Sequence, residues 1–160
     1  QIVYNLMLKE ISIPEDNIHR IRGENDPLFE VGRYEDELKK HFALGSGENP
    51  SLDWIFLGVG LDGHTASIFP GSIFENSTSQ FCGATTHPDT GQNRISLSLS
   101  VINASKRITV MVAGQDKAAI VSQILNPPFE GSKLPAGKIR PLKGNVEWVL
   151  DELAASQLKK

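Results

Sequence analysis

The residues best suited to proton transfer are Asp62 and His64, which stand two positions apart in a glycine-rich turn. Histidine is the side chain best able to accept a proton near neutral pH, and a neighbouring carboxylate can fix its tautomer or stabilise its protonated form. Gly60 and Gly63 permit positive φ angles and a close approach of the backbone to a ligand. The turn is therefore a candidate site of acid–base chemistry, although an Asp-Gly-His turn on its own need not be catalytic.

Two hydroxyl side chains, Thr65 and Ser67, follow this turn. We expect a short helix to begin here, because Thr and Ser are common at helix starts. The free amides of a helix start would suit an anionic group of a ligand.

Residues 58–63 also match G-x-G-x-x-G after an apolar strand, a pattern typical of dinucleotide-binding proteins. The context opposes that interpretation. Asp62 lies where a pyrophosphate needs bare amides, and Pro70 stops any helix long enough to cross a sheet. No acidic residue closes a second strand about twenty positions later. We therefore expect no nucleotide cofactor.

Helix and strand patterns alternate along the chain. Asp26 and Pro27 begin a predicted helix over 27–43, and a second helix is predicted over 115–125. Strands are predicted at 54–59, near 81–86, and at 94–100 and 107–113, the first of them as a strand covered on both faces. The last helix is predicted to start at Asn145, with an apolar stripe of Val146, Val149, Leu150 and Leu153.

This alternation predicts an α/β fold of three layers, with a mostly parallel, Rossmann-like sheet flanked by helices, in a single domain over residues 1–160. Ligand chemistry is expected at the carboxyl ends of the strands. The chain opens on Gln1, and Ile2, Val3, Leu6 and Met7 are spaced like the buried face of a helix. We therefore expect the chain to be cut from a longer protein.

Composition limits the classes of partner. The 160 residues carry a net charge of −3, and their 16 Lys and Arg are scattered, so neither nucleic acid nor an anionic membrane is an expected partner. Any bound phosphate is expected to be small and held by a few groups. The single cysteine, Cys82, excludes an internal disulfide, and no membrane-length apolar run or leader is apparent, which favours a cytoplasmic protein. The histidines other than His64 lack the spacing of metal ligands. We therefore assign six residues to packing or structure: His19, His41, His87, Cys82, Trp54 and Trp148.

The stretch Gly58–Gly71 resembles the signature G-x-G-x-D-G-H-T-A-S-x-F-P-G of the 6-phosphogluconolactonases, at every fixed position. Further similar segments follow in the family's order. They are R-I-S-L-S-L from Arg94, V-I-N-A from Val101, V-A-G-Q-D-K-A from Val112, and the closing pattern from Leu134 through Ile139-Arg-Pro to Asp151. Residues 13–21 resemble the family's linker, so the resemblance spans essentially the whole chain.

The resemblance implies hydrolysis of 6-phosphoglucono-δ-lactone, a small sugar phosphate, with no required cofactor or metal. His64 corresponds to the general base that activates water and can then protonate the ring oxygen, and Asp62 corresponds to its supporting carboxylate. Lys117 corresponds to the lysine that binds the substrate phosphate; otherwise it is an exposed lysine of a first helical turn. Arg94 is a candidate second contact or else a solvated strand-end arginine, and Arg140 fits the closing pattern. Gly58 and Gly60 are expected to shape the pocket wall, and Gly63 and Thr65 are further candidate substrate-binding residues.

Two family features, a Gly-Gly-[ST] phosphate loop and a D-E-R segment, are not present in the chain. We expect both upstream, together with the first strands of the sheet, so that residues 1–160 alone should hydrolyse the lactone poorly. Glucosamine-6-phosphate deaminases are an alternative, since they share the fold and a related D-G-H loop. They continue with I-A-F-N-E-P, whereas Thr65-Ala-Ser-Ile-Phe-Pro lacks that glutamate. A non-catalytic sugar-phosphate sensor is the third possibility.

Overall fold

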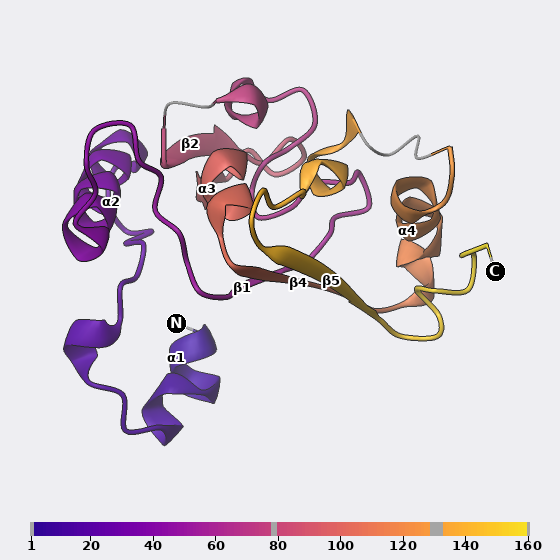
Figure 1. Cartoon of the computed structure of the whole chain (residues 1–160), viewed down its shortest axis with the longest axis horizontal. Coiled ribbons are helices and arrows are strands. Elements are labelled where there is room, and N and C mark those ends of the chain that lie inside the picture. The colour runs from indigo at the N-terminus through magenta and orange to yellow at the C-terminus, as the bar shows by residue number, and fades with distance from the viewer. Residues whose placement is uncertain (1, 78–79, 129–132, 160) are drawn as a thin grey trace.

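The structure, a computed structural model, describes residues 2–77, 80–128 and 133–159. Three parallel strands form the central sheet, in the order β1 (Ile55–Leu57), β4 (Arg107–Val112) and β5 (Asn145–Leu150). Helices α3 (Leu99–Ala104) and α4 (Ala118–Leu125) lie on one side of this sheet (Figure 1). The expected α/β class, with a parallel sheet flanked by helices, is confirmed.

The core lies between the sheet and these helices. Alternate residues of β4, among them Ile108 and Val110, are fully buried and pack with Ile102 of α3 and Val121 of α4. The opposite face of the sheet is open: Phe56, Met111 and Val149 are 56%, 53% and 52% exposed. The expectation that the first strand is covered on both faces is therefore wrong for the part of the chain that the structure describes.

The predicted last helix is also wrong, because residues Asn145–Leu150 form strand β5. This strand pairs in parallel with β4 over six positions, from Arg107↔Asn145 to Val112↔Leu150. Val146, Trp148 and Leu150 pack against the core. They are spaced two residues apart, which is the period of a strand and not of a helix. Backbone pairing with the buried strand β4 therefore decides the structure of this segment, although its apolar residues are also spaced as on one face of a helix.

A separate antiparallel hairpin lies beside the sheet, formed by β2 (Cys82–Thr86) and β3 (Asn93–Leu97). The predicted strand over 94–100 ends early, because the hydroxyl of Ser98 accepts from Val101 N and caps helix α3. Helix α2 (Pro27–Phe42) packs on the hairpin, with its Glu35 carboxylate accepting from Phe81 N at 2.9 Å. Cys82 is buried as expected, and burial raises the pKa of its thiol to about 12.

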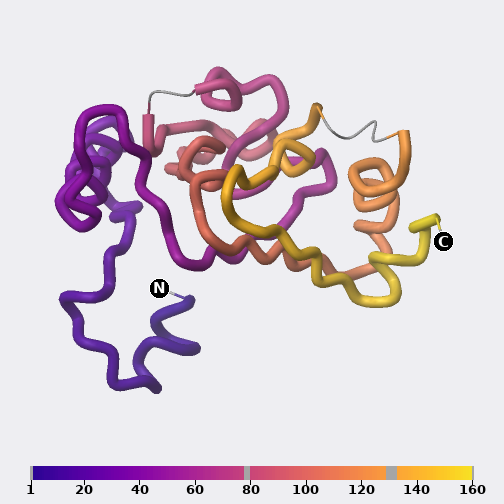
Figure 2. The backbone as a smooth tube through the Cα atoms, in the orientation of Figure 1, coloured from indigo at the N-terminus to yellow at the C-terminus, as the bar shows by residue number. Residues whose placement is uncertain are grey.

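The N-terminal segment lies apart from the body of the molecule (Figure 2). It contains α1 (Ile2–Leu6) and the single turns η1 (Leu8–Glu10) and η2 (Glu15–Asn17). Ile2 and Leu6 are 74% and 77% exposed, so the expected helix is present but its expected burial is not. The other short helices are η3 (Ile73–Asn76), η4 (Gln115–Lys117) and η6 (Pro135–Lys138). Among the described residues, none of the helices is both long and apolar enough to cross a membrane.

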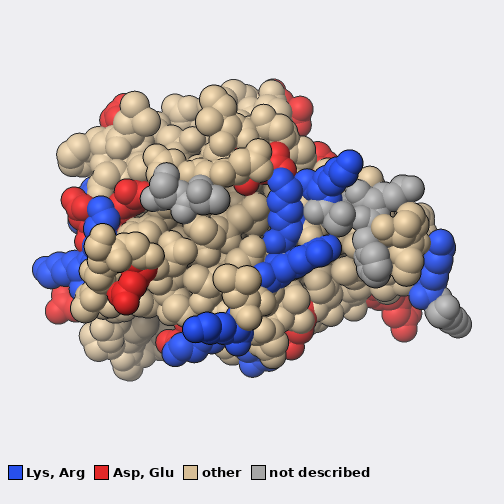
Figure 3. Space-filling model, turned by 45° about the horizontal axis from the view of Figure 1, so that its top comes forward, with Lys and Arg blue, Asp and Glu red and all other residues tan. Residues whose placement is uncertain are grey.

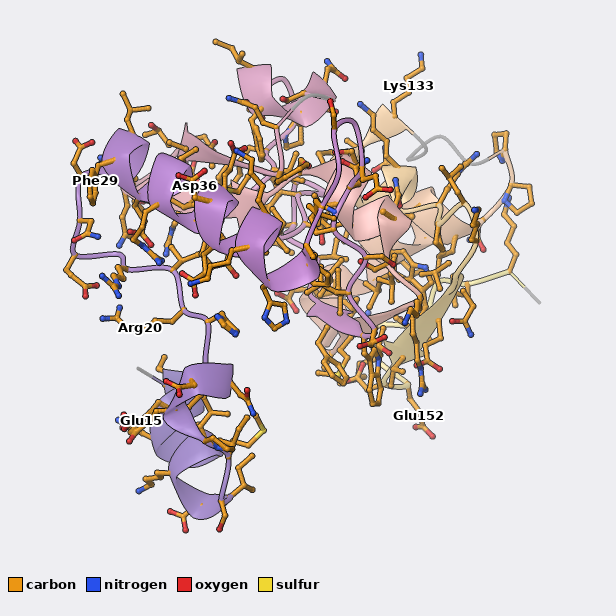
Figure 4. The ribbon with its side chains drawn as sticks, turned by 60° about the vertical axis from the view of Figure 1, so that its left-hand side comes forward. Glu15, Arg20, Phe29, Asp36, Lys133 and Glu152 are labelled. Carbon is orange, nitrogen blue, oxygen red and sulfur yellow. The ribbon has the colours of Figure 1, made fainter. Side chains whose placement is uncertain are left out.

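A buried carboxylate holds the linker after α1 against helix α2. The linker carries Arg20 and runs beside the helix that carries Asp36 (Figure 4). Glu30 of α2 is fully buried and accepts from Arg22 N at 2.7 Å, from Asn25 Nδ2 at 2.8 Å and from the Arg33 guanidinium at 2.6 Å. The hydrogen bonds from Arg33, helped by those of Arg22 and Asn25, outweigh burial and lower the pKa of Glu30 to about 2.

We predict that Glu30→Gln lowers the free energy of unfolding by about 1–3 kcal/mol at pH 7, because it removes a buried, hydrogen-bonded charge. The folded-state pKa lies below the ordinary value of 4.5. The charge therefore contributes stability above pH 4.5, and this contribution is lost as the pH falls toward 2. Urea unfolding at several pH values should show the wild type and variant converging in acid. Asp36→Asn, an exposed position on the same helix, is the control, and an equal loss there would contradict the prediction.

Candidate active site

The loop after β1 folds back on itself through backbone hydrogen bonds. Gly60 N donates to His64 O at 2.9 Å, and Gly63 N donates to Gly60 O at 3.0 Å. Gly63 has a φ of +81°, a conformation that favours glycine. We expected a helix to start at residues 65–67, but none does. Thr65 instead pairs with Ile68 in an isolated bridge. The site is a closed turn rather than a helix N-terminus.

Gly60 lies directly beneath the two candidate side chains. A Cβ at this position would stand 2.1 Å from His64 Nδ1 and 2.6 Å from Asp62 Oδ1. Only a residue without a side chain leaves room for both groups here. The glycine therefore permits the pairing of Asp62 with His64, in addition to shaping the loop.

Asp62 accepts two hydrogen bonds from His64. Its Oδ1 lies 3.1 Å from the backbone N of His64 and 2.6 Å from the ring Nδ1. Partial burial opposes ionisation of Asp62, but these hydrogen bonds outweigh it and hold the pKa of the carboxyl below its ordinary value. An ionised carboxylate can only accept, so the proton of a neutral His64 ring sits on Nδ1. The lone pair on Nε2 is then available to a ligand or water.

Three elements hold the loop, two of which, β3 and η6, are distant in the sequence. The Thr65 hydroxyl is fully buried and donates to Gly58 O at 3.0 Å, at the end of β1. Ser67 N donates to the hydroxyl of Ser96 on β3 at 3.1 Å, and Gly63 O accepts from Ala136 N of η6 at 3.0 Å. Thr65, expected to bind substrate, thus has its hydroxyl proton engaged within the loop.

Lys117 reaches the same loop from η4, just after β4. Its Nζ donates to Val59 O at 3.0 Å, next to Gly60. An ammonium group has three N–H donors, so two remain for a ligand. The structure therefore brings Lys117 to the loop of Asp62 and His64, and its carbonyl contact distinguishes it from a freely solvated lysine.

The hairpin has one side that faces this loop, made by Gly83, Thr85, His87, Arg94 and Ser96. The register pairs Gly83 with Ser96 and Thr85 with Arg94, and directly paired residues share a side. Ser96 accepts from Ser67 of the loop, and a Cβ on Gly83 would lie 2.4 Å from the Phe74 ring. Arg94 therefore belongs to the loop-facing side of the hairpin, and its guanidinium has no hydrogen-bond partner among the described residues. Some Lys and Arg side chains lie right of the middle of the face shown in Figure 3, and others lie along its edges.

Arg140 is connected less directly. It lies two residues after η6, and its backbone N donates to Asn103 Oδ1 at 2.7 Å. Within the described residues no contact joins its side chain to the loop. Two residues near the loop, Ser96 and Phe69, were not predicted as site residues. The Phe69 ring lies 4.7 Å from the His64 ring. The sequence held a signal for each: Ser96 is on the polar side of an alternating strand, and Phe69 is a fixed position of the signature.

A cavity elsewhere in the structure offers less chemistry than this loop. A cavity of about 450 Å³ beside the linker is lined by two ion pairs, Arg20–Glu24 and Arg33–Glu37, and also by Glu15 and Arg22. No cluster of three or more metal-ligating side chains occurs in residues 2–77, 80–128 and 133–159. The loop remains the candidate with an available base and available donors.

Comparison with known proteins decides the family. The family described as glucosamine-6-phosphate isomerases/6-phosphogluconolactonase matches residues 1–148. The chain belongs to this family. A 6-phosphogluconolactonase of Haemophilus influenzae is 43% identical over 98% of the chain, and that of Aggregatibacter actinomycetemcomitans is also 43% identical. The chain spans 65% of the length of both relatives.

Solved structures agree with the fold. The crystal structure of a protein titled devB matches with a TM-score of 0.89 and 41% identity, over 98% of this chain and 65% of that one. A monomeric glucosamine-6-phosphate deaminase matches with a TM-score of 0.74 over 98% of this chain and 66% of that one. Its identity of 23% supports a common fold only.

We predict that Gly63→Ala destabilises the protein more than Gly71→Ala. Both glycines have positive φ, +81° and +74°, so either alanine incurs a backbone cost of about 1–2 kcal/mol. Only at Gly63 would the new Cβ also lie 2.7 Å from Leu134 Cδ1, whereas it meets nothing within 4 Å at Gly71. Thermal unfolding of the two variants separates the steric cost from the backbone cost. Equal losses would show that Leu134 yields without cost.

Proposed function

We propose that this chain carries the proton-transfer site of a 6-phosphogluconolactonase, which hydrolyses 6-phosphoglucono-δ-lactone to 6-phosphogluconate. The observation that carries the proposal is the 2.6 Å contact between Asp62 Oδ1 and His64 Nδ1, which leaves Nε2 as the available base. The relatives named 6-phosphogluconolactonase, at 43% identity, support the same reaction. We place the reaction in the cytoplasm, in keeping with the single buried thiol.

The mechanism needs two proton transfers at one nitrogen. His64 Nε2 takes a proton from water as the water oxygen attacks the lactone carbonyl carbon, which gives a tetrahedral intermediate. Asp62 stabilises the resulting imidazolium. When the intermediate collapses, the bond from the former carbonyl carbon to the ring oxygen breaks, and Nε2–H returns the proton to that oxygen. The product is an open-chain acid with a new hydroxyl, and the histidine is regenerated.

Lys117 is the proposed phosphate contact, with Arg94 as a second one. A point charge with two unused donors suits a phosphate group. Thr65, Gly58, Gly60 and Gly63 hold the loop in shape around the substrate, and Arg140 is kept as a weaker candidate contact. These groups need no metal or cofactor for the reaction as written.

A deaminase acting on glucosamine 6-phosphate is the second candidate. The family includes both activities, and a deaminase shares the fold. The segment after His64 reads Thr-Ala-Ser-Ile-Phe-Pro and lacks the glutamate of the deaminase pattern, which favours the lactonase. Release of ammonia from glucosamine 6-phosphate, without lactone hydrolysis, would reverse this choice.

The test uses two proteins. One is the purified 160-residue chain; the other is a chimera in which these residues replace the matched 65% of the Haemophilus influenzae relative. With freshly prepared lactone, corrected for spontaneous hydrolysis, we expect turnover by the chimera and little or none by the chain alone. An inactive but folded chimera would refute the lactonase proposal. Full catalytic efficiency of the chain alone would refute the expectation that activity needs the part of the relatives that this chain does not cover.

We predict that His64→Ala lowers kcat of the chimera by about 10²- to 10⁴-fold, the usual contribution of a positioned general base. Affinity for 6-phosphogluconate should change little, which separates an enzyme from a sugar-phosphate sensor. Asp62→Asn should cause a smaller loss, because the amide oxygen still accepts while the charge is removed. His41→Ala, an exposed position on α2, is the control. Undiminished turnover in His64→Ala would exclude the general-base role.

We predict that Lys117→Met raises KM about 10- to 100-fold and leaves kcat closer to the wild-type value. A hydrogen bond to a charged group contributes about 1.5–3 kcal/mol, and about 1.4 kcal/mol corresponds to a factor of ten. Lys106→Met is the matched control, since Lys106 pairs with Asp53 on the surface. Steady-state kinetics of both variants decide the matter, and a selective fall in kcat would assign Lys117 to the chemical step instead.

A further inference from the structure

His87 stands at the end of the loop-facing side of the hairpin, although its sequence context suggested only a structural role. His87 N donates to Gln92 O at 2.9 Å, which extends the hairpin pairing by one step beyond Thr86. The alternation that puts Gly83 and Thr85 on the loop-facing side therefore puts His87 there too. Arg94 pairs with Thr85, so His87 and Arg94 are diagonal neighbours.

Ring contacts connect His87 to the proton-transfer site. The Phe69 ring is nearly buried and lies 5.1 Å from the His87 ring and 4.7 Å from the His64 ring, between centroids. A single aromatic side chain thus contacts both histidines. The hairpin and the loop meet at this point, as they also do at Ser67 and Ser96.

The turn that follows fixes the tautomer of His87. Asp89 N and Thr90 N both point to its Nδ1, at 3.2 Å and 3.4 Å. Backbone N–H groups only donate, so Nδ1 is the acceptor and a neutral ring carries its proton on Nε2. Neither this Nε2–H nor the guanidinium of Arg94 has a hydrogen-bond partner among the described residues. The loop-facing side of the hairpin therefore presents donors without an acceptor.

We propose that His87 is a substrate-binding residue, which donates from Nε2 to a phosphate oxygen of the sugar phosphate alongside Arg94. This inference rests on the proposed function, since it assigns a further contact to the same substrate. The hairpin then supplies contacts to the site in addition to the one that Lys117 makes from η4. Phosphate binding by Arg94 and His87 holds the sugar next to Nε2 of His64.

Two variants separate binding from turn formation. In His87→Asn the amide oxygen takes the place of Nδ1 and still accepts from Asp89 N and Thr90 N, but the donor at Nε2 is lost. In His87→Gln the amide NH₂ takes the place of Nε2–H, and the acceptor for the turn is lost. A substrate contact is impaired by Asn and restored by Gln, whereas a purely structural role gives the opposite result.

The measurements are KM for the lactone in the chimera and Kd for 6-phosphogluconate by calorimetry, with melting temperatures of all variants. We expect His87→Asn to raise KM and Kd about 5- to 50-fold at nearly unchanged kcat and melting temperature, following the usual contribution of a hydrogen bond to a charged group. His87→Gln should recover most of this affinity despite a lower melting temperature. His41→Asn is the control.

The outcomes distinguish this inference from the proposed function. If the wild-type chimera turns over lactone and binds 6-phosphogluconate, but His87→Asn matches it in KM and Kd, the assignment of His87 is wrong while the lactonase proposal stands. Impaired binding in His87→Gln with wild-type binding in His87→Asn limits His87 to the turn. A wild-type chimera that neither binds 6-phosphogluconate nor hydrolyses lactone overturns both.

Discussion

A 2.6 Å contact joins Asp62 Oδ1 to His64 Nδ1, and the surrounding chain is arranged so that this contact can form. The carboxylate needs the backbone of His64 to turn toward it, which the bond from Gly60 N to His64 O achieves. It also needs an empty space where the Cβ of residue 60 would be. The chemical capacity of the site thus depends on a glycine and a backbone hydrogen bond as much as on the two titratable side chains.

The loop is irregular, yet it is fixed from several directions. Thr65 ties it to the end of β1, Ser96 ties it to the hairpin, and Ala136 ties it to η6. These anchors come from residues far apart in the sequence, so the loop reaches its shape only when sheet, hairpin and η6 are assembled. Functional loops on a rigid scaffold gain their precision in this way. The geometry of the site therefore depends on tertiary contacts and not on the loop sequence alone.

Much of the fold could be predicted from local signals, and the failures have a common cause. The cap at Asp26, the proline at 27 and the apolar run of Arg107–Val112 located α2 and β4 because each signal is local. Residues Asn145–Leu150 were predicted as a helix but form a strand, because their pairing partner β4 lies some forty positions earlier. The same holds for the site: the sequence predicts Asp62 and His64 as candidate residues, but no local pattern places His87 beside Phe69.

The positions of individual cations matter more for this protein than its net charge. The net charge is −3, which would repel a phosphate in bulk. Some cations are neutralised locally, as Arg33 is by Glu30 and Lys138 by Glu75. Lys117, in contrast, contacts only a carbonyl, and Arg94 pairs with no carboxylate in the described residues. Under the proposed function, these two cations without a carboxylate partner would allow an acidic protein to bind a small anion. Selectivity would then depend on the position of these two cations relative to the loop.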